Sequence, residues 1–243
     1  MSVVDFSLDG RVALVTGGSR GIGRAIALAF AEAGADVAVS SRKLPDLEQV
    51  AEEIKAAGRK GLAVSSHIAK PEESGNLVET VKKEFGRIDI LVNNAATNPY
   101  TGPLIDAEEW AWDVTMNVNL KGPFVLSQLV ARVMRDQGGG SIINVASTAG
   151  INPSMLHIYS VTKAALIMLT RVMAMELGKH NIRANAIAPA MIKTRFSEVL
   201  WKGTPAEDTI ALPEDVAGAA LYLASDASRY VNGETIVIGG AGG

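Results

Sequence analysis

The chain has 243 residues, of which 48% are hydrophobic and 20% charged, and its formal net charge is -3. It is long enough to bury a large α/β core, and neither its charge nor any basic tract favours nucleic acid or an anionic membrane as a partner. It has no cysteine and only three scattered histidines, so disulfides and thiolate metal sites are excluded and no metal is expected. The N-terminus lacks a basic segment followed by an apolar run, and no eighteen-residue apolar stretch stands out elsewhere, so we expect a cytoplasmic protein without a membrane span.

Short apolar runs alternate with segments of helical periodicity along the whole chain. Because the runs are continuously apolar, they indicate strands buried on both faces, as in a parallel sheet covered by helices. They lie at residues 11–16, 36–41, 61–66, 88–93, 141–147, 182–189 and 234–239. Helical segments at 21–34, 44–58 and 71–86 each end at a glycine, which suits a helix C-terminus. We predict one doubly wound α/β domain over residues 1–243, with about seven strands and helices on both faces.

A glycine-rich loop, TGGSRGIG, follows the first predicted strand and opens the first helix. Gly17, Gly21 and Gly23 have the spacing that lets a pyrophosphate reach the helix N-terminal amides without meeting a Cβ. The motif is weak alone, since glycines here could simply form a strand-to-helix turn. Its place in the first βα unit favours a dinucleotide site.

The end of the second strand indicates which dinucleotide binds. An acid there would accept hydrogen bonds from the adenosine ribose, but the residues are Ser40, Ser41, Arg42 and Lys43, with Arg20 in the glycine loop. Guanidinium groups suit the extra phosphate of NADP, which a carboxylate would repel. We therefore predict NADP rather than NAD; the alternative is that Arg42 and Lys43 are solvated loop charges.

A phenol and an ammonium stand four residues apart near the start of a long apolar segment, at Tyr159 and Lys163. In a helix this spacing places both on one face. Lys163, together with the positive nicotinamide of an oxidised cofactor, would lower the pKa of the phenol from its usual value of about 10 and make it a better proton donor at neutral pH. The alternative is a snorkelling lysine beside an amphipathic tyrosine.

Six motifs in fixed order resemble the short-chain dehydrogenase/reductase family, from about Leu8 to the C-terminus. They are TGGSRGIG, NNAA (93–96), NVNLKGPF (117–124), NVASTAG (144–150), YSVTK (159–163) and APAMIKT (188–194). The resemblance implies a single Rossmann-type domain, and MIKTRFSEVLWK is similar to the NADP-dependent carbonyl reductase subgroup. It implies Tyr159 as general acid/base, Lys163 as its activator, Ser147 as the hydroxyl that orients the carbonyl, and Asn119 as the anchor of a water relay.

The expected cofactor contacts combine the glycine loop, the second strand end and the family's positions. They are Gly17, Ser19, Arg20, Gly21, Ile22, Gly23, Ser41, Arg42, His67, Ile68, Asn93, Ala95, Tyr159, Lys163, Pro189, Ile192 and Thr194. Four positions depart from the family pattern. Ala96 and Ala190 replace usual glycines, and His67 and Ile238 stand where an aspartate is common.

The irregular segment 193–213 predicts a short substrate lid. An apolar pocket under it would be lined by Met155, Leu156, Met191, Phe196, Leu200 and Trp201, although these could instead be plain core. We expect the substrate to be an apolar ketone or aldehyde, or the corresponding alcohol. The alternatives are a catalytically silent NADP-binding sensor or scaffold and a 3-oxoacyl-thioester reductase.

The predicted helix over 164–177 is apolar nearly all round and needs cover on more than one side. The family's tetramers imply a homo-oligomer, and complete burial within a monomer is the alternative.

Overall fold

The computed structural model describes residues 4–204, 207 and 209–239. Its centre is one sheet of seven parallel strands in the order β3-β2-β1-β4-β5-β6-β7. The strands are β1 (Val12–Thr16), β2 (Asp36–Ser41), β3 (Gly61–Ser65), β4 (Ile90–Asn93), β5 (Gly140–Val145), β6 (Ile182–Pro189) and β7 (Thr235–Ile238). The predicted doubly wound α/β domain is thus confirmed, and strand bounds differ from the prediction by no more than a few residues.

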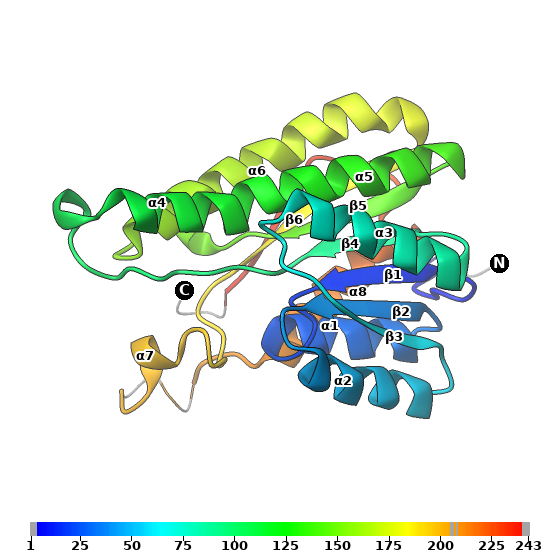
Figure 1. Cartoon of the computed structure of the whole chain (residues 1–243), viewed down its shortest axis with the longest axis horizontal. Coiled ribbons are helices and arrows are strands. Elements are labelled where there is room, and N and C mark those ends of the chain that lie inside the picture. The colour runs from blue at the N-terminus through cyan, green and yellow to red at the C-terminus, as the bar shows by residue number, and fades with distance from the viewer. Residues whose placement is uncertain (1–3, 205–206, 208, 240–243) are drawn as a thin grey trace.

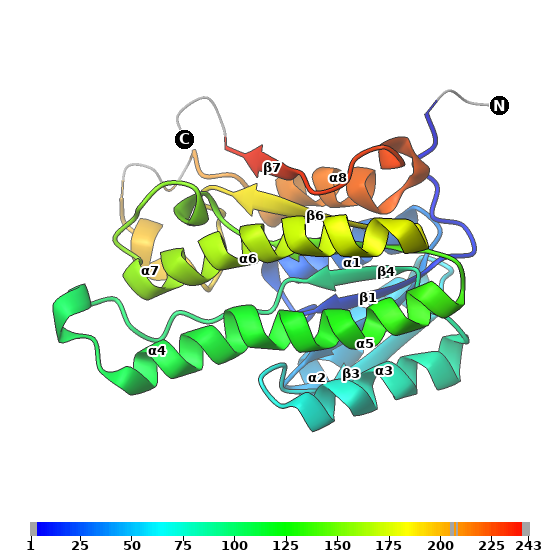
Figure 2. The same cartoon turned by 90° about the horizontal axis from the view of Figure 1, so that it is seen from above.

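Helices cover both faces of the sheet. They are α1 (Gly21–Glu32), α2 (Leu44–Ala56), α3 (Pro71–Phe85), α4 (Glu109–Met116), α5 (Gly122–Asp136), α6 (His157–Leu177), α7 (Glu198–Trp201) and α8 (Pro213–Ala224). Helices α3, α5 and α6 lie on one face, and α1, α2 and α8 on the other (Figures 1 and 2). Helix α4 extends the line of α5 beyond the sheet, joined to it by the π-helical segment η2 (Asn117–Lys121).

Each central strand is buried on both sides, which explains the continuous apolar runs. In β1, Ala13 and Val15 belong to the core under α1, α2 and α8, whereas Leu14 belongs to the core under α3, α5 and α6. All three side chains are fully buried. Because alternate residues of a strand face opposite sides, a strand between two helix layers needs apolar residues at every position.

The strand order reverses between β2 and β4, which flank β1 on its two sides. Chain segments that leave the carboxyl ends of neighbouring strands here diverge to opposite faces of the sheet and leave a crevice between them. The glycine loop after β1 lies at this point, next to the segment that follows β4. The topology thus brings together motifs that are about 75 residues apart in the sequence.

Helix α6 is more hydrophobic than we expected from its sequence. The range His157–His180 is long and apolar enough to cross a membrane by length and composition alone, contrary to our expectation that no such stretch exists. Half of its most apolar window is buried inside the protein, as in a helix that packs on a core. Such a helix on its own is weak evidence for a membrane span.

Candidate active site

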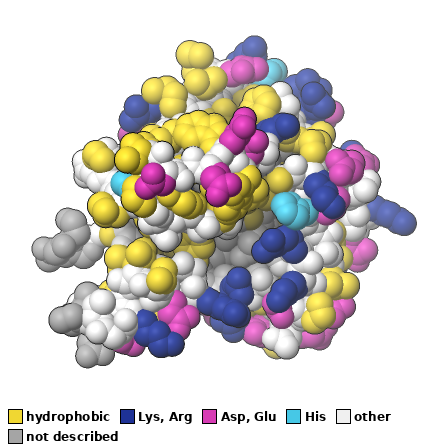
Figure 3. Space-filling model, turned by 60° about the vertical axis from the view of Figure 1, so that its left-hand side comes forward, with side chains coloured by type: hydrophobic (Ala, Val, Ile, Leu, Met, Phe, Trp, Pro, Cys, Tyr) yellow, Lys and Arg dark blue, Asp and Glu magenta, His cyan; other side chains and the backbone are white. Residues whose placement is uncertain are grey.

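A cavity of about 1130 Å³ runs along the carboxyl edge of the sheet. Most of the residues predicted to bind cofactor or substrate line it. These are Gly17, Ser19, Arg20, Gly21, Ile22, Ser41, Arg42, His67, Ile68, Ala95, Ser147, Tyr159, Lys163, Pro189, Ile192 and Thr194. Figure 3 shows a hollow with Lys and Arg side chains gathered on one side and hydrophobic side chains on the other. The cavity therefore has a basic end and an apolar end.

The glycine loop forms a close-packed turn at the basic end. Gly17 and Gly21 have φ of 65° and 55°, in the left-handed region that favours glycine. A Cβ on Gly17 would lie 2.7 Å from Asn94 Nδ2 and 3.0 Å from the Cα of Ala95, so no side chain fits there. Helix α1 starts directly after the loop without a side-chain cap, which leaves backbone N–H groups for a phosphate.

Thr16 and Asn94, neither of which we predicted as site residues, hold this loop against β4. The Thr16 hydroxyl accepts hydrogen bonds from the backbone N–H groups of Asn94 (3.0 Å) and Ala95 (3.2 Å). The Asn94 side chain donates to the carbonyls of Thr16 (2.9 Å) and Gly17 (3.2 Å). The sequence signal was the second asparagine of NNAA, but only the strand order shows that it reaches the glycine loop.

Two predicted cofactor residues do not line the cavity. A Cβ on Gly23 would lie 2.4 Å from the carbonyl oxygen of Gly17, so Gly23 allows α1 to pack closely on the loop. Asn93 is 2% exposed, and its Nδ2 donates to Ser127 Oγ and Asn144 Oδ1. Both residues thus have a structural role, and the predicted cofactor contact of each stays a prediction.

Asn119 is likewise fully buried, in the π-helical segment η2, and does not line the cavity. Its Oδ1 accepts from the Thr97 N–H (2.8 Å), and its Nδ2 donates to the Thr97 carbonyl (2.9 Å) and to Thr162 Oγ1 (3.2 Å). Both amide hydrogens are therefore used within the protein. The side-chain amide braces α6 and the loop after β4, and the water relay stays a prediction.

Ser147, Tyr159 and Lys163 meet at the middle of the cavity. Ser147 follows β5, and the other two residues lie one turn apart on α6. The Ser147 side chain lies close enough to the Tyr159 hydroxyl to favour its ionised form, and Ser147 Oγ donates to the Pro189 carbonyl at 3.4 Å. The Lys163 ammonium lies 5.3 Å from the centroid of the Tyr159 ring and donates to the Val145 carbonyl at 2.6 Å. The predicted group thus comes together, with Lys163 anchored on the β5 backbone.

Burial shifts the pKa values of both members of the pair. It raises the pKa of Tyr159 to about 12, against a smaller lowering by the nearby Ser147 side chain. Burial lowers the pKa of Lys163 to about 7. In the chain alone, burial therefore outweighs any lowering of the Tyr159 pKa, because both groups are desolvated and the ammonium donates to the Val145 carbonyl. The predicted lowering requires the oxidised cofactor as well as Lys163, so it stays a prediction.

The apolar end of the cavity lies next to Tyr159. Its walls include Met155, Leu156, Met191, Phe196 and Leu200, as predicted. The Phe196 ring packs against the Tyr159 ring, with centroids 5.7 Å apart. Trp201 does not line the cavity. It is 8% exposed, and its Nε1 donates to Ser197 Oγ at 3.1 Å, so it anchors the segment that carries Phe196.

The fold and this site define a short-chain dehydrogenase/reductase. The model of the short chain dehydrogenase family matches residues 11–204, and the chain belongs to this family. It is therefore an oxidoreductase that uses a nicotinamide dinucleotide. The predicted resemblance to the carbonyl reductase subgroup is consistent with the relatives described below.

Relatives and solved structures cover nearly the whole chain. Human dehydrogenase/reductase SDR family member 4 is 41% identical, over 96% of this chain and 87% of the relative. A short-chain type dehydrogenase/reductase from Mycobacterium marinum is 38% identical with a TM-score of 0.93, over 97% of this chain and 96% of that one. A 7α-hydroxysteroid dehydrogenase in complex with NADH and 7-oxo glycochenodeoxycholic acid is 35% identical with a TM-score of 0.92, over 98% of this chain and 96% of that one.

The basic end of the cavity fits a dinucleotide. The left-handed turn at Gly17 and the uncapped start of α1 form a cradle that any Cβ at Gly17 would fill. Ser41 and Arg42 line the same end, beyond the glycine loop. Among residues 4–204, 207 and 209–239, no group of three or more His, Asp or Glu side chains could hold a metal ion.

Proposed function

We propose that the protein is an NADP(H)-dependent reductase that interconverts an apolar ketone or aldehyde and its alcohol. The observation that carries this proposal is the meeting of Ser147, Tyr159 and Lys163 between a phosphate-binding cradle and an apolar wall. A dinucleotide in the cradle places its reactive end toward the middle of the edge, as in doubly wound folds generally. The substrate's apolar substituents then lie against Phe196 and its neighbours.

The proposed mechanism uses the hydroxyls of Ser147 and Tyr159 together. Ser147 holds the carbonyl oxygen, and Tyr159 transfers a proton to that oxygen during reduction. The bound cofactor supplies the hydride for the carbonyl carbon and, once oxidised, a positive charge. Lys163, held on the Val145 carbonyl beside the Tyr159 ring, stabilises the phenolate that proton transfer leaves. A phenol buried among apolar groups needs such cations to ionise near neutral pH.

The substrate class is tested by following NADPH oxidation with ketones and aldehydes of graded size and polarity, with NADH in parallel. We expect turnover that is fastest with apolar carbonyl compounds. Tight NADPH binding without turnover on any of them would favour the sensor or scaffold alternative. Turnover confined to 3-oxoacyl thioesters would favour a 3-oxoacyl-thioester reductase, which differs from the proposed enzyme only in its substrate.

The preference for NADP is proposed from the cations at the end of β2. Arg20 and Arg42 line the cavity, and neither has an ion pair or hydrogen bond to a carboxylate within the described residues. Ser41 stands where an acid would repel the 2′-phosphate. Unpaired guanidinium groups beside a ribose site are suited to bind that phosphate bidentately.

Replacing Arg42 with alanine is expected to raise KM for NADPH by about tenfold to a hundredfold, because a hydrogen bond to a charged group contributes about 1.5–3 kcal/mol. KM for NADH should stay nearly constant. Arg229→Ala, an exposed arginine on another part of the surface, is the control. Equal effects of Arg42→Ala on both cofactors would argue against phosphate recognition.

We also propose that residues 193–213 act as a lid over the apolar end, of which residues 205, 206 and 208 lie outside the described residues. The two ends of the segment are paired. Ile192 and Ala211 form an isolated parallel β-bridge, and the Lys193 N–H donates to the Ala211 carbonyl at 2.8 Å. Ser197 Oγ donates to the Ile192 carbonyl at 2.5 Å. Phe196 is thereby presented to the cavity from an anchored loop.

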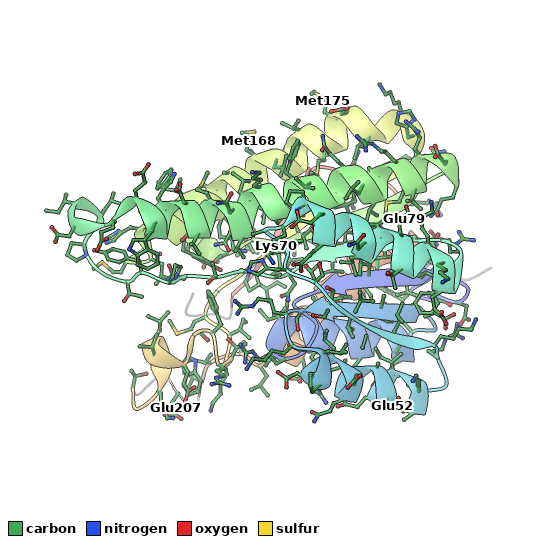
Figure 4. The ribbon with its side chains drawn as sticks, in the orientation of Figure 1. Glu52, Lys70, Glu79, Met168, Met175 and Glu207 are labelled. Atoms are coloured by element: carbon green, nitrogen blue, oxygen red, sulfur yellow. The ribbon has the colours of Figure 1, made fainter. Side chains whose placement is uncertain are left out.

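We propose a homo-oligomer, with a tetramer as the family expectation, formed through the outer face of α6. Val161, Met168, Val172 and Met175 of this helix are 44–80% exposed. Met168 and Met175 point away from the molecule on α6 (Figure 4). The described residues thus leave an apolar stripe on a helix, which a second copy would cover.

Replacing Met168 and Val172 together with glutamate is expected to dissociate the oligomer, because the charges would be desolvated at the interface. Sedimentation velocity of the wild type and the variant measures the change. Val199→Glu, at an 82% exposed valine on α7, is the control that adds charge elsewhere. A monomeric wild type would refute the proposal.

A further inference from the structure

Two threonines on α6 form the same unusual arrangement with an asparagine. Thr162 and Thr170 are fully buried. Each hydroxyl donates to a carbonyl of its own helix, at 2.7 Å and 2.8 Å. Each hydroxyl also accepts a hydrogen from a buried asparagine amide, Asn119 Nδ2 at 3.2 Å and Asn144 Nδ2 at 2.8 Å respectively. We call these the amide–threonine pairs. They fasten α6 to the core at two levels, and Lys163 lies between them.

The Asn144–Thr170 pair belongs to a wider buried network. Asn144 Oδ1 accepts from Asn93 Nδ2 at 2.8 Å, and the same Nδ2 donates to Ser127 Oγ at 2.9 Å. The four side chains come from β4, β5, α5 and α6, and none is more than 2% exposed. Hydrogen bonds in such a dry environment are strong, and a broken one leaves a buried polar group unpaired. The network therefore holds α6 firmly against the two central strands.

This network meets Lys163 through the backbone of β5. Asn144 immediately precedes Val145, whose carbonyl accepts the hydrogen bond from Lys163 Nζ at 2.6 Å. Thr170 lies seven residues, or about two turns, after Lys163 on α6. The same point of β5 is thus tied to α6 twice, once by a side-chain amide and once by the lysine. Because these two ties share the strand and the helix, loosening one changes the separation that the other must span.

We propose that Asn144 and Thr170 are positioning residues that hold α6 against β5 so that the Lys163 ammonium stays between the Val145 carbonyl and the Tyr159 ring. The inference rests on the proposed function in one respect only, namely that Tyr159 and Lys163 carry out the proton transfer. Neither Asn144 nor Thr170 lines the cavity, so neither contacts substrate or cofactor. Their effect must therefore pass through Lys163.

The test is Thr170→Val, which keeps the shape of the side chain and removes the hydroxyl. We expect kcat to fall about tenfold to a hundredfold, as for a reacting group displaced by a fraction of an ångström to one ångström. The midpoint of the pH profile of kcat should shift, while KM for NADPH changes little. Thr170→Ser retains the hydroxyl and is expected to restore both properties to within about twofold of the wild type.

The matched control is Thr115→Val on α4. Thr115 is also fully buried, and its hydroxyl donates to the Ala111 carbonyl of its own helix at 2.6 Å. Within the described part of the chain, no side-chain amide bonds it. Thr115→Val therefore removes the same group without touching the network. We expect it to lower the melting temperature and leave the pH profile unchanged.

A second readout does not depend on turnover. In protein labelled with ¹³C at lysine Cε, Lys163 should be the lysine that titrates near neutral pH, since burial lowers its pKa to about 7. Thr170→Val should move its midpoint upward, toward that of an ordinary lysine, because a loosened helix admits water around the ammonium. Thr115→Val and Thr170→Ser should leave that midpoint in place.

The outcomes separate the two proposals. If Thr170→Val lowers only stability, and both the pH profile and the lysine titration match the wild type, the positioning role is refuted. If the wild type reduces no carbonyl compound, the proposed function fails. A shifted lysine titration in Thr170→Val would still support the positioning role, and an unshifted one would overturn it.

Discussion

Replacing Tyr159 with phenylalanine is expected to lower kcat for carbonyl reduction by about a hundred- to ten-thousandfold, the usual contribution of a positioned proton donor. The variant keeps the ring that packs on Phe196 and loses only the hydroxyl beside Ser147. The fold and the cofactor cradle should therefore be unchanged. Steady-state kinetics with NADPH, together with a direct measurement of NADPH affinity, checks both parts of the expectation.

Tyr222→Phe is the matched control for this experiment. Tyr222 packs its ring on Phe6, 6.4 Å away, and does not line the cavity. Removing its hydroxyl should leave kcat within about twofold of the wild type, as for a surface change distant from the chemistry. Turnover by Tyr159→Phe at the wild-type rate would refute the assigned role of the phenol.

Replacing Lys163 with methionine should abolish the activation of Tyr159 and, near neutral pH, stabilise the fold. Lys163 is 2% exposed, and burial lowers its pKa from 10.5 to about 7. Between these two values the unfolded chain binds a proton at this lysine and the folded chain does not. The free energy of unfolding of the wild type therefore rises with pH across this window, by about 1.4 kcal/mol per pH unit at most, relative to the methionine variant.

The measurement is denaturant unfolding of both proteins between pH 7.5 and pH 9.5, without cofactor. At pH 7.5 we expect Lys163→Met to be the more stable protein. As the pH rises to 9.5, the unfolding free energy of the wild type should increase by roughly 2 kcal/mol relative to that of the variant. Lys179→Met, at an exposed lysine, should show no such trend. Parallel stability curves for wild type and Lys163→Met would mean that Lys163 is not held in the desolvated state.

The two experiments bear on one physical point. In the chain alone, burial opposes the charged form of both Tyr159 and Lys163. Desolvation of these two groups has a free-energy cost that a bound charged group can offset. Such a cost is typical of active sites and atypical of a structural ion pair. Stability lost at Lys163 is thus the expected counterpart of its proposed catalytic role.

The sequence alone determined the fold class and most of the site. Continuous apolar strands between helical segments indicated a parallel sheet with two covered faces, since each strand residue needs an apolar environment whichever side it faces. The family motifs then placed Ser147, Tyr159 and Lys163 correctly in one cavity. The spacing of Tyr159 and Lys163 sufficed for this pair, because a helix fixes the relative direction of side chains four residues apart.

Only the tertiary structure decided which way the other motif residues face and what surrounds them. Asn93 and Asn119 lie in motifs that border the cavity, yet their side chains point into the core, where their partners Ser127, Asn144 and Thr162 come from distant parts of the chain. The desolvation of Tyr159 and Lys163 in the chain alone was not evident from the sequence for the same reason. Desolvation depends on every atom that packs around a group, whereas a sequence pattern reports only its neighbours along one helix.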